Sequence, residues 1–254
     1  MLIGLFTLLA ALFFGPGESP FILPKAEKKV KKMVLDKERK KEVLAIMKDY
    51  KKEWKALNKT KKKQTKTIAK LNKDRSADQK QLEELFEAFR DQRMELNNKL
   101  IDGRLKAAEI IEQDEWDNIM ADVKVPKPKV EKKLTKAEAK AKIKQDKKIQ
   151  AIGDEVEAAF SDPGKREQAT KYLLEFENNI VELLTTANNF NYKDQKALHS
   201  RDASREEILA VVEKLEDFRA KTHQSYLSLR QNLVKLSSDD DWPKLAKALN
   251  KFVK

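Results

Sequence analysis

Long apolar stripes with alternating spacings of three and four residues restrict the fold of this 254-residue chain more than any other feature. Residues at this spacing lie on one side of an α-helix and form a heptad pattern. The chain also has only 6 glycines and 7 prolines, too few for the many turns of an all-β fold. The sequence therefore predicts an all-α protein.

Four such stripes follow one another along the chain. The first comprises Val43, Met47, Tyr50, Trp54, Leu57, Ile68 and Leu71. The second comprises Leu82, Phe86, Phe89, Leu96, Leu100, Ala107 and Ile110, with Arg93 and Gly103 as weak points in its register. The third comprises Ala169, Leu173, Phe176, Ile180, Leu183, Ala187 and Phe190. The fourth comprises Ile208, Val211, Leu215, Phe218, Leu229 and Leu236.

The turns between the stripes pair them into two antiparallel helical hairpins with long, coiled-coil-like helices. A break at 72–75 separates the first two stripes, and Ser76-Ala77-Asp78-Gln79 has the form of a capping box that starts the second helix. Asp202 and Ser204 are candidate caps for the last long helix. Residues 25–75 carry 21 basic and 7 acidic side chains, whereas residues 76–123 carry 6 and 13, so opposite charges favour pairing of the first two helices.

Composition divides the chain into four parts. Residues 1–24 form a hydrophobic segment, and residues 25–123 form the first hairpin with a short helix after it. Residues 124–134 form a linker rich in proline and lysine, because two prolines within Val125–Lys129 prevent a continuous helix. Residues 135–254 form the second hairpin, again with a short helix at its end.

The two hairpins resemble each other in sequence, which predicts a tandem repeat of about 125 residues. The segment LEELFEAFR (Leu82–Arg90) corresponds to VVEKLEDFR (Val211–Arg219). Trp116 follows Phe89 by 27 positions, and Trp242 follows Phe218 by 24. We expect these four aromatic residues to anchor the repeats, each tryptophan holding its short helix against its own hairpin. The alternative is a chance resemblance between amphipathic helices.

The N-terminal segment is interpreted as an uncleaved membrane anchor. Its apolar run of 13 residues is shorter than a straight transmembrane helix, but Phe21-Ile22-Leu23 extends it beyond a glycine- and proline-rich break. No basic residue precedes the run, which argues against a secretory signal peptide, and packing into the protein's own core is a further alternative. The candidate anchor residues are Leu2, Ile3, Leu5, Phe6, Leu8, Leu9, Leu12, Phe13 and Phe14.

Many lysines follow the anchor, and short basic flanks tend to stay in the cytoplasm. Charge therefore favours a cytoplasmic body, with export to a periplasm as the alternative. The lysines also form candidate contacts with an anionic surface. The candidates are Lys28, Lys29, Lys31, Lys32, Lys59, Lys61, Lys62, Lys63 and Lys66.

Residues for catalysis are scarce. The chain has no cysteine and two histidines, and we expect His199 to be a solvated surface residue and His223 to be a partly exposed helix residue. No Ser-His-Asp, P-loop, GxGxxG or zinc-protease motif occurs, and neither histidine follows a glutamate by three positions as a di-iron bundle would require. We therefore expect a protein without enzymatic activity, catalytic residues, metal or cofactor.

Taken together, these features predict a membrane-tethered, all-helical scaffold or assembly subunit that binds protein partners and could form homo-oligomers. A basic helical module for anionic lipid or nucleic acid is the alternative. Nucleic acid is disfavoured because only 10 of the 54 basic residues are arginine and the aromatic residues lie on the apolar stripes. A hairpin-type periplasmic chaperone or stress sensor is a further alternative, resting on architecture alone.

Overall fold

The structure is a computed structural model that describes residues 26–121, 150–188 and 199–252. The described part is all-α, as predicted, and contains no strand. Its labelled helices are α2 (Ala26–Met33), α3 (Lys37–Lys73), α4 (Gln79–Ile110), α5 (Gln113–Met120), α7 (Pro163–Asn188), α9 (Arg205–Leu236) and α10 (Trp242–Phe252). Residues 150–157 are also helical. The predicted anchor and linker lie outside the described residues.

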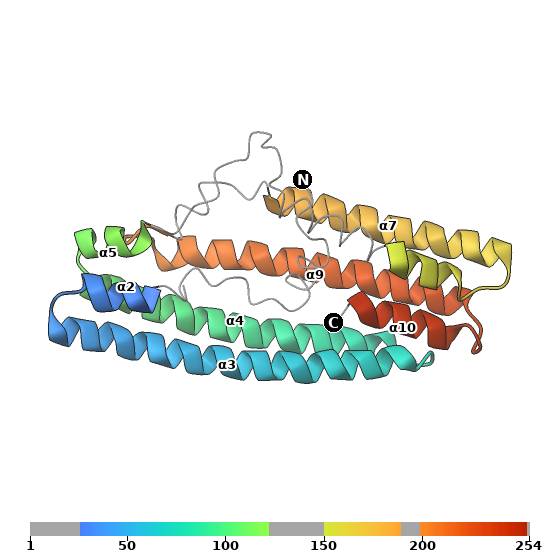
Figure 1. The fold of residues 1–254 in the computed structure, drawn as a ribbon, viewed down its shortest axis with the longest axis horizontal. Coiled ribbons are helices and arrows are strands. Elements are labelled where there is room, and N and C mark those ends of the chain that lie inside the picture. Colours follow the sequence, from blue (N-terminus) through green and yellow to red (C-terminus); the bar gives the residue numbers. More distant parts are fainter. Residues whose placement is uncertain (1–25, 122–149, 189–198, 253–254) are drawn as a thin grey trace.

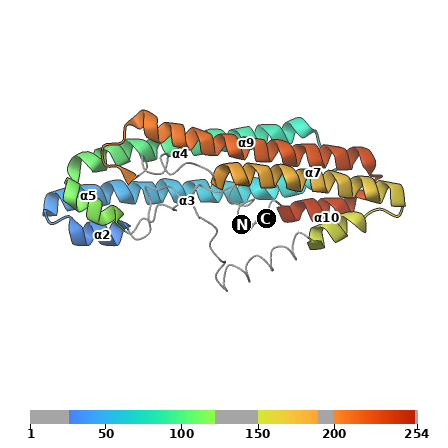
Figure 2. The same cartoon turned by 90° about the horizontal axis from the view of Figure 1, so that it is seen from above.

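Four long helices form an elongated bundle (Figure 1). Helices α3 and α4 pair as one antiparallel hairpin, and α7 and α9 pair as the other. The hairpins join mainly through α4 and α9, which form one layer, while α3 and α7 lie in a second (Figure 2). The short helices close the two ends, with α2 against α5 at one end and α10 against α3 at the other. The two predicted hairpins thus share one bundle.

Side-chain caps start the long helices. The carboxylate of Asp36 accepts a hydrogen bond from the backbone N–H of Arg39 at the start of α3. Asp78 caps α4 through the N–H of Lys80, so the predicted capping box at Ser76 is wrong. Ser204 caps α9 in a full capping box, as its sequence position predicts. Short polar side chains fill these positions because they satisfy N–H groups that lack partners inside the helix.

The two halves of the structure are related by a constant offset. Helix α9 begins and ends 126 residues after α4, and α7 begins 126 residues after α3. Asp162, 126 residues after Asp36, also accepts a hydrogen bond from the N–H three positions on. This register supports the predicted repeat but pairs Phe89 with Leu215 and Arg93 with Arg219. The alignment of Phe89 with Phe218 is therefore displaced by about one helical turn, which explains the unequal spacings to the tryptophans.

Contacts between the halves are reciprocal. The Arg104 guanidinium donates to the Ser200 carbonyl at 2.5 Å, and Arg230, 126 residues later, donates to the Asp74 carbonyl at 3.0 Å. In the same way Arg75 donates to the Ser237 carbonyl, and Arg201 donates to the carbonyl of residue 111. Such exchange is the signature of two copies packed about an approximate twofold axis. Here both copies belong to one chain.

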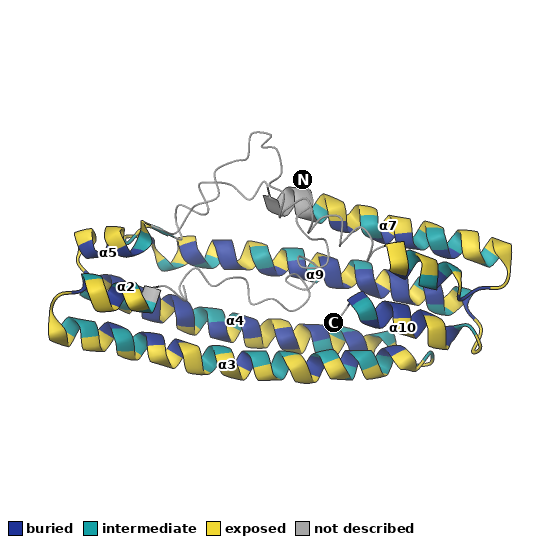
Figure 3. Ribbon diagram, in the orientation of Figure 1, coloured by how far each residue is buried: buried dark blue, intermediate teal, exposed yellow. Residues whose placement is uncertain are grey.

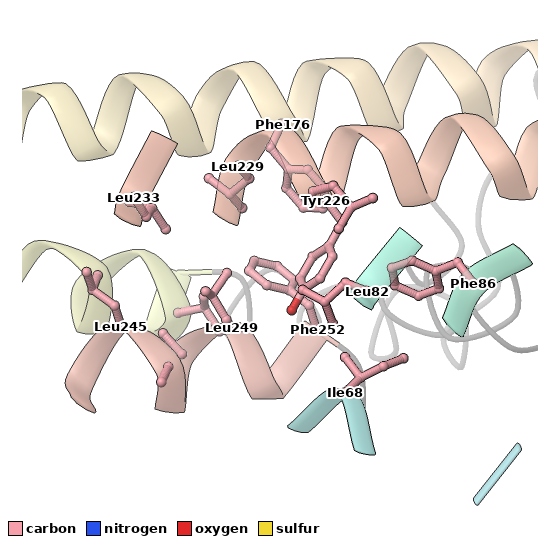
Figure 4. Packing of buried hydrophobic residues seen from close by; sticks show 14 of the residues in the cluster. Ile68, Leu82, Phe86, Phe176, Tyr226, Leu229, Leu233, Leu245, Leu249 and Phe252 are labelled. Carbon is pink, nitrogen blue, oxygen red and sulfur yellow. The ribbon is translucent and has the colours of Figure 1, made fainter. Parts of the chain in front are cut away.

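The buried side of every long helix faces this shared interior (Figure 3). At the α10 end, Leu245 and Leu249 are fully buried and pack with residues of α3, α4, α7 and α9 (Figure 4). Burying one leucine side chain contributes about 1.5–3 kcal/mol, so α10 is an integral part of the core. Phe176 and Phe252 meet edge to face, with ring centroids 5.2 Å apart.

Gly103, which interrupts the apolar stripe of α4, has a steric role. The Tyr50 hydroxyl crosses from α3 and donates to the Leu100 carbonyl of α4 at 3.0 Å. A Cβ at Gly103 would lie 2.6 Å from Tyr50 Cζ and 2.8 Å from Cε1, and closer still to the hydroxyl oxygen. The missing side chain therefore provides the space for a buried tyrosine, whose pKa is raised mainly by burial.

Candidate functional site

A charged cluster lies at the centre of the bundle. Arg93 of α4 donates through Nε to both Glu216 oxygens at 3.0 Å and through Nη2 to Oε2 at 2.5 Å. Arg219, one turn along α9 from Glu216, binds the same carboxylate. All three side chains are at most 5% exposed. The sequence alone shows Arg93 only as a break in an apolar stripe, because its partner is 123 residues away.

The cluster is asymmetric in charge. Arg93 and Arg219 are equivalent in the repeat, whereas the position equivalent to Glu216 is the exposed Arg90. One carboxylate therefore serves two guanidinium groups. Burial opposes ionisation of Glu216, but hydrogen bonds and charges from both arginines hold its pKa below the usual range. With the carboxylate fully engaged, the arrangement locks α4 to α9 rather than offering an acid or base to a substrate.

The two repeat tryptophans bind across the halves. The Trp116 indole N–H donates to the His199 carbonyl at 3.0 Å, and the Trp242 N–H donates to the Asn72 carbonyl at 3.0 Å. Arg104 lies over the Trp116 ring, 5.0 Å from its centroid, and burial lowers the pKa of this arginine to about 10. The expectation that each tryptophan holds its own hairpin misses these bonds, which join one hairpin to the other.

The predicted phenylalanine anchors differ in burial. Phe89 is 1% exposed and lies under the Arg93 guanidinium, whose Cζ is 4.7 Å from the ring centroid. Phe218 is only partly buried at the edge of the core. The difference follows from the register, because the position equivalent to Phe218 is the exposed Gln92.

Both histidines are more buried than the sequence predicts. His223 is 5% exposed and stacks on Phe86, with ring centroids 4.1 Å apart. His199 is half-buried at the α5 end, where burial and the charge of Arg104 lower its pKa. Within the described ranges, no group of three or more His, Asp or Glu residues could hold a metal ion.

Two of the lysines predicted to contact an anionic surface, Lys29 and Lys61, are partly buried. Lys29 is partly buried and donates to the carbonyls of Asn118 and Ile119 at 3.2 Å, at the end of α5. Lys61 is half-buried beside the central cluster, and burial and the charge of Arg219 lower its pKa. Both lysines are therefore less exposed than the other candidates for contact with an anionic surface. The exposed ones are Lys28, Lys31, Lys32, Lys59, Lys62, Lys63 and Lys66.

Three of these exposed lysines, Lys59, Lys62 and Lys66, belong to a longer row of lysines along α3. The set, here called the α3 lysine row, follows steps of four and three and comprises Lys55, Lys59, Lys62, Lys66, Lys70 and Lys73. All six are exposed, and they lie opposite the buried side that contains Leu57, Gln64 and Ile68. The periodic spacing of the lysines is the sequence signal for this row, and it has the same period as the apolar stripe on the other side of the helix.

A pocket of about 470 Å³ lies where the row ends. Its wall comes from α3 and α10 and comprises Lys73, Pro243, Ala246, Lys247, Asn250 and Lys251. Lys251 donates to Glu155 at 2.6 Å, which places a carboxylate at one side of the pocket. Lys247 lies 4.0 Å from the same carboxylate, so Glu155 compensates both α10 lysines of the pocket.

Comparison with known proteins finds no family, no curated protein and no solved structure that matches this chain. In the described part of the chain, no helix has the length and apolar character required to cross a membrane. The candidate anchor residues, from Leu2 to Phe14, lie outside that part.

Proposed function

We propose that this protein is a membrane-tethered, non-catalytic scaffold that holds a helical protein partner along α7. The proposal rests on a difference in residue type between α3 and α7, which occupy equivalent places in the two halves. Helices α3 and α7 run along opposite long edges of the bundle (Figure 1), yet the positions that are Lys48 and Lys55 in α3 are Leu174 and Val181 in α7. Leu174 is 53% exposed and Val181 is 36% exposed, although both are large and apolar.

The chemistry of this surface indicates the kind of partner. Leu174 and Val181 are seven residues apart and lie on one side of α7. The exposed carboxylates Glu175 and Glu182 follow them directly. An apolar pair one heptad apart with acidic neighbours suits an amphipathic helix that has an apolar stripe and basic flanks. Burial of the polar clusters within the bundle supports a role in binding rather than in catalysis.

A photo-crosslinking experiment tests the partner. A crosslinking amino acid at Leu174 in the full-length protein should give a discrete adduct in cells, whereas one at the exposed Gln92 of α4 should not. Adding Val181→Asp should abolish the adduct without changing the helical content measured by circular dichroism. Identical products from positions 174 and 92, or an adduct that survives Val181→Asp, would overturn the proposed surface.

Membrane fractionation tests the tether separately. The full-length protein should remain in the membrane pellet after alkaline extraction, because an apolar segment in the bilayer is not released by disrupting charge. Complete release into the supernatant would contradict the tether while leaving the α7 partner surface to the crosslinking experiment.

A further inference from the structure

The second half of α3 has an extreme charge. Residues 54–73 contain eight lysines and no acidic residue. The first and last lysines of the α3 lysine row, Lys55 and Lys73, are 18 positions apart, which corresponds to about 27 Å along a helix. Because α3 runs along an outer edge of the bundle, the row can contact a flat surface along its whole length (Figure 1).

The fold does not require these lysines. Helix α7 occupies the equivalent place in the second copy, and it forms with Val181, Thr185 and Asn188 at the positions of Lys55, Lys59 and Lys62. Equivalent helices therefore tolerate apolar or neutral residues at these places. A series of like charges on one face destabilises a helix slightly, so helix formation alone gives no reason for Lys55, Lys59 and Lys62.

The bundle also leaves the row uncompensated. Among the described residues, no carboxylate lies within ion-pair distance of any of its six lysines, whereas Lys51 on the neighbouring side of α3 pairs with Glu27. The row therefore presents its full charge to solvent, where an external anionic surface can meet it.

The residue types distinguish a lipid surface from a nucleic acid. Single-stranded nucleic acid is usually bound with exposed aromatic residues, and duplexes are read largely by arginine. The two aromatic residues of α3, Tyr50 and Trp54, pack in or against the core, and its one arginine, Arg39, pairs with Glu115. Lysine alone on a straight outer edge suits the headgroups of a flat bilayer, which require charge but no base recognition.

We propose that the α3 lysine row binds the anionic headgroups of a phospholipid bilayer and lays the bundle along the membrane. The inference deepens the proposed function, on which it rests for the presence of a membrane near the bundle. With α3 on the lipid, α7 lies along the opposite long edge (Figure 1). The exposed Leu174 and Val181 belong to α7, so the partner helix and the lipid are held by different helices.

Vesicle sedimentation of the full-length protein tests the proposal. Vesicles of phosphatidylcholine alone report the N-terminal tether, and vesicles with about 30% phosphatidylserine add the charged surface. Each lysine near such a surface should strengthen binding by about fivefold, so Lys59→Gln, Lys62→Gln and Lys66→Gln together should lower the preference for anionic over phosphatidylcholine vesicles roughly 100-fold. Raising the salt from about 0.1 M to about 0.5 M should lower the wild-type preference in the same direction, while binding through the tether persists.

A matched variant controls for net charge. Lys106, Lys171 and Lys221 are exposed on other helices, and changing all three to glutamine removes the same charge away from the row. The control should bind anionic vesicles within about threefold of wild type, since these lysines lie away from the row. Equal losses in the two triple variants would overturn the proposal, provided that circular dichroism shows both to be folded.

The two vesicle types separate the tether from the row. Binding to anionic vesicles only would support the row and contradict the tether. Equal wild-type binding to both types at low salt would support the tether and overturn the row, and binding to neither would overturn both. Displacement from anionic vesicles by a short DNA duplex at lower phosphate concentration than the lipid would also overturn the proposal, because the row would then prefer nucleic acid.

Discussion

Replacing Gly103 by alanine should destabilise the bundle, against the usual preference of a helix. In an exposed helix interior, Gly→Ala stabilises by about 1 kcal/mol. At Gly103 the new methyl group would overlap the Tyr50 ring, with Cζ only 2.6 Å away. Overpacking of this kind costs about 1–3 kcal/mol, and loss of the buried Tyr50–Leu100 hydrogen bond adds about 1 kcal/mol. We therefore expect a net loss of about 2 kcal/mol.

Urea unfolding followed by circular dichroism measures this change. Gly153→Ala is the matched control, because its Cβ would meet only Leu173 Cδ2 at 3.6 Å, an ordinary contact. The control should be neutral or stabilising by up to about 1 kcal/mol. Tyr50→Phe should relieve part of the Gly103→Ala cost, since the hydroxyl is the closest atom but the ring carbons remain. A Gly103→Ala variant as stable as wild type would refute this account of the α3–α4 contact.

Three further predictions concern the core. Glu216→Gln should lower the free energy of unfolding by about 3–5 kcal/mol, because it leaves Arg93 and Arg219 buried without a carboxylate; a loss below about 1 kcal/mol would argue against the cluster. Since the Glu216 pKa is depressed in the folded state, the difference between wild type and Glu216→Gln should shrink as pH falls below about 4.3. A difference that stays constant in acid would be inconsistent with an ionised Glu216. Phe89→Ala should cost about 3–5 kcal/mol and Phe218→Ala about 1–2 kcal/mol, measured by urea unfolding; equal costs would favour the alignment of Phe89 with Phe218.

Local signals explain what could be predicted from the amino-acid order. Ser204 caps α9 and Glu207 completes the capping box, and both lie within one turn of the helix that they start. The apolar stripes likewise record only which side of each helix is buried, so they predict helices and hairpins without naming partners. The spacing of the six lysines in the α3 lysine row is likewise visible in the sequence, because it depends only on positions within one helix.

Sequence patterns do not predict the environment of a residue whose contacts lie far along the chain. Arg93 interrupts an apolar stripe and is understood only with Glu216 opposite it. His223 is predicted from its sequence position to be partly exposed, but in the bundle its ring stacks on Phe86. The repeat register was displaced because heptad sequences match one another at several offsets, whereas caps and reciprocal arginines fix a single one.

The sequence by itself determined the all-α class, the positions of the long helices and the contrast between a lysine-rich and a carboxylate-rich pair of arms. These properties depend on contacts within a few turns of one helix. Only the tertiary structure decided that two hairpins form one bundle about an approximate twofold axis, with tryptophans and arginines exchanged between the halves. Such contacts depend on the shape and charge of surfaces that meet only after the helices have formed, and identical heptad patterns are compatible with many of them.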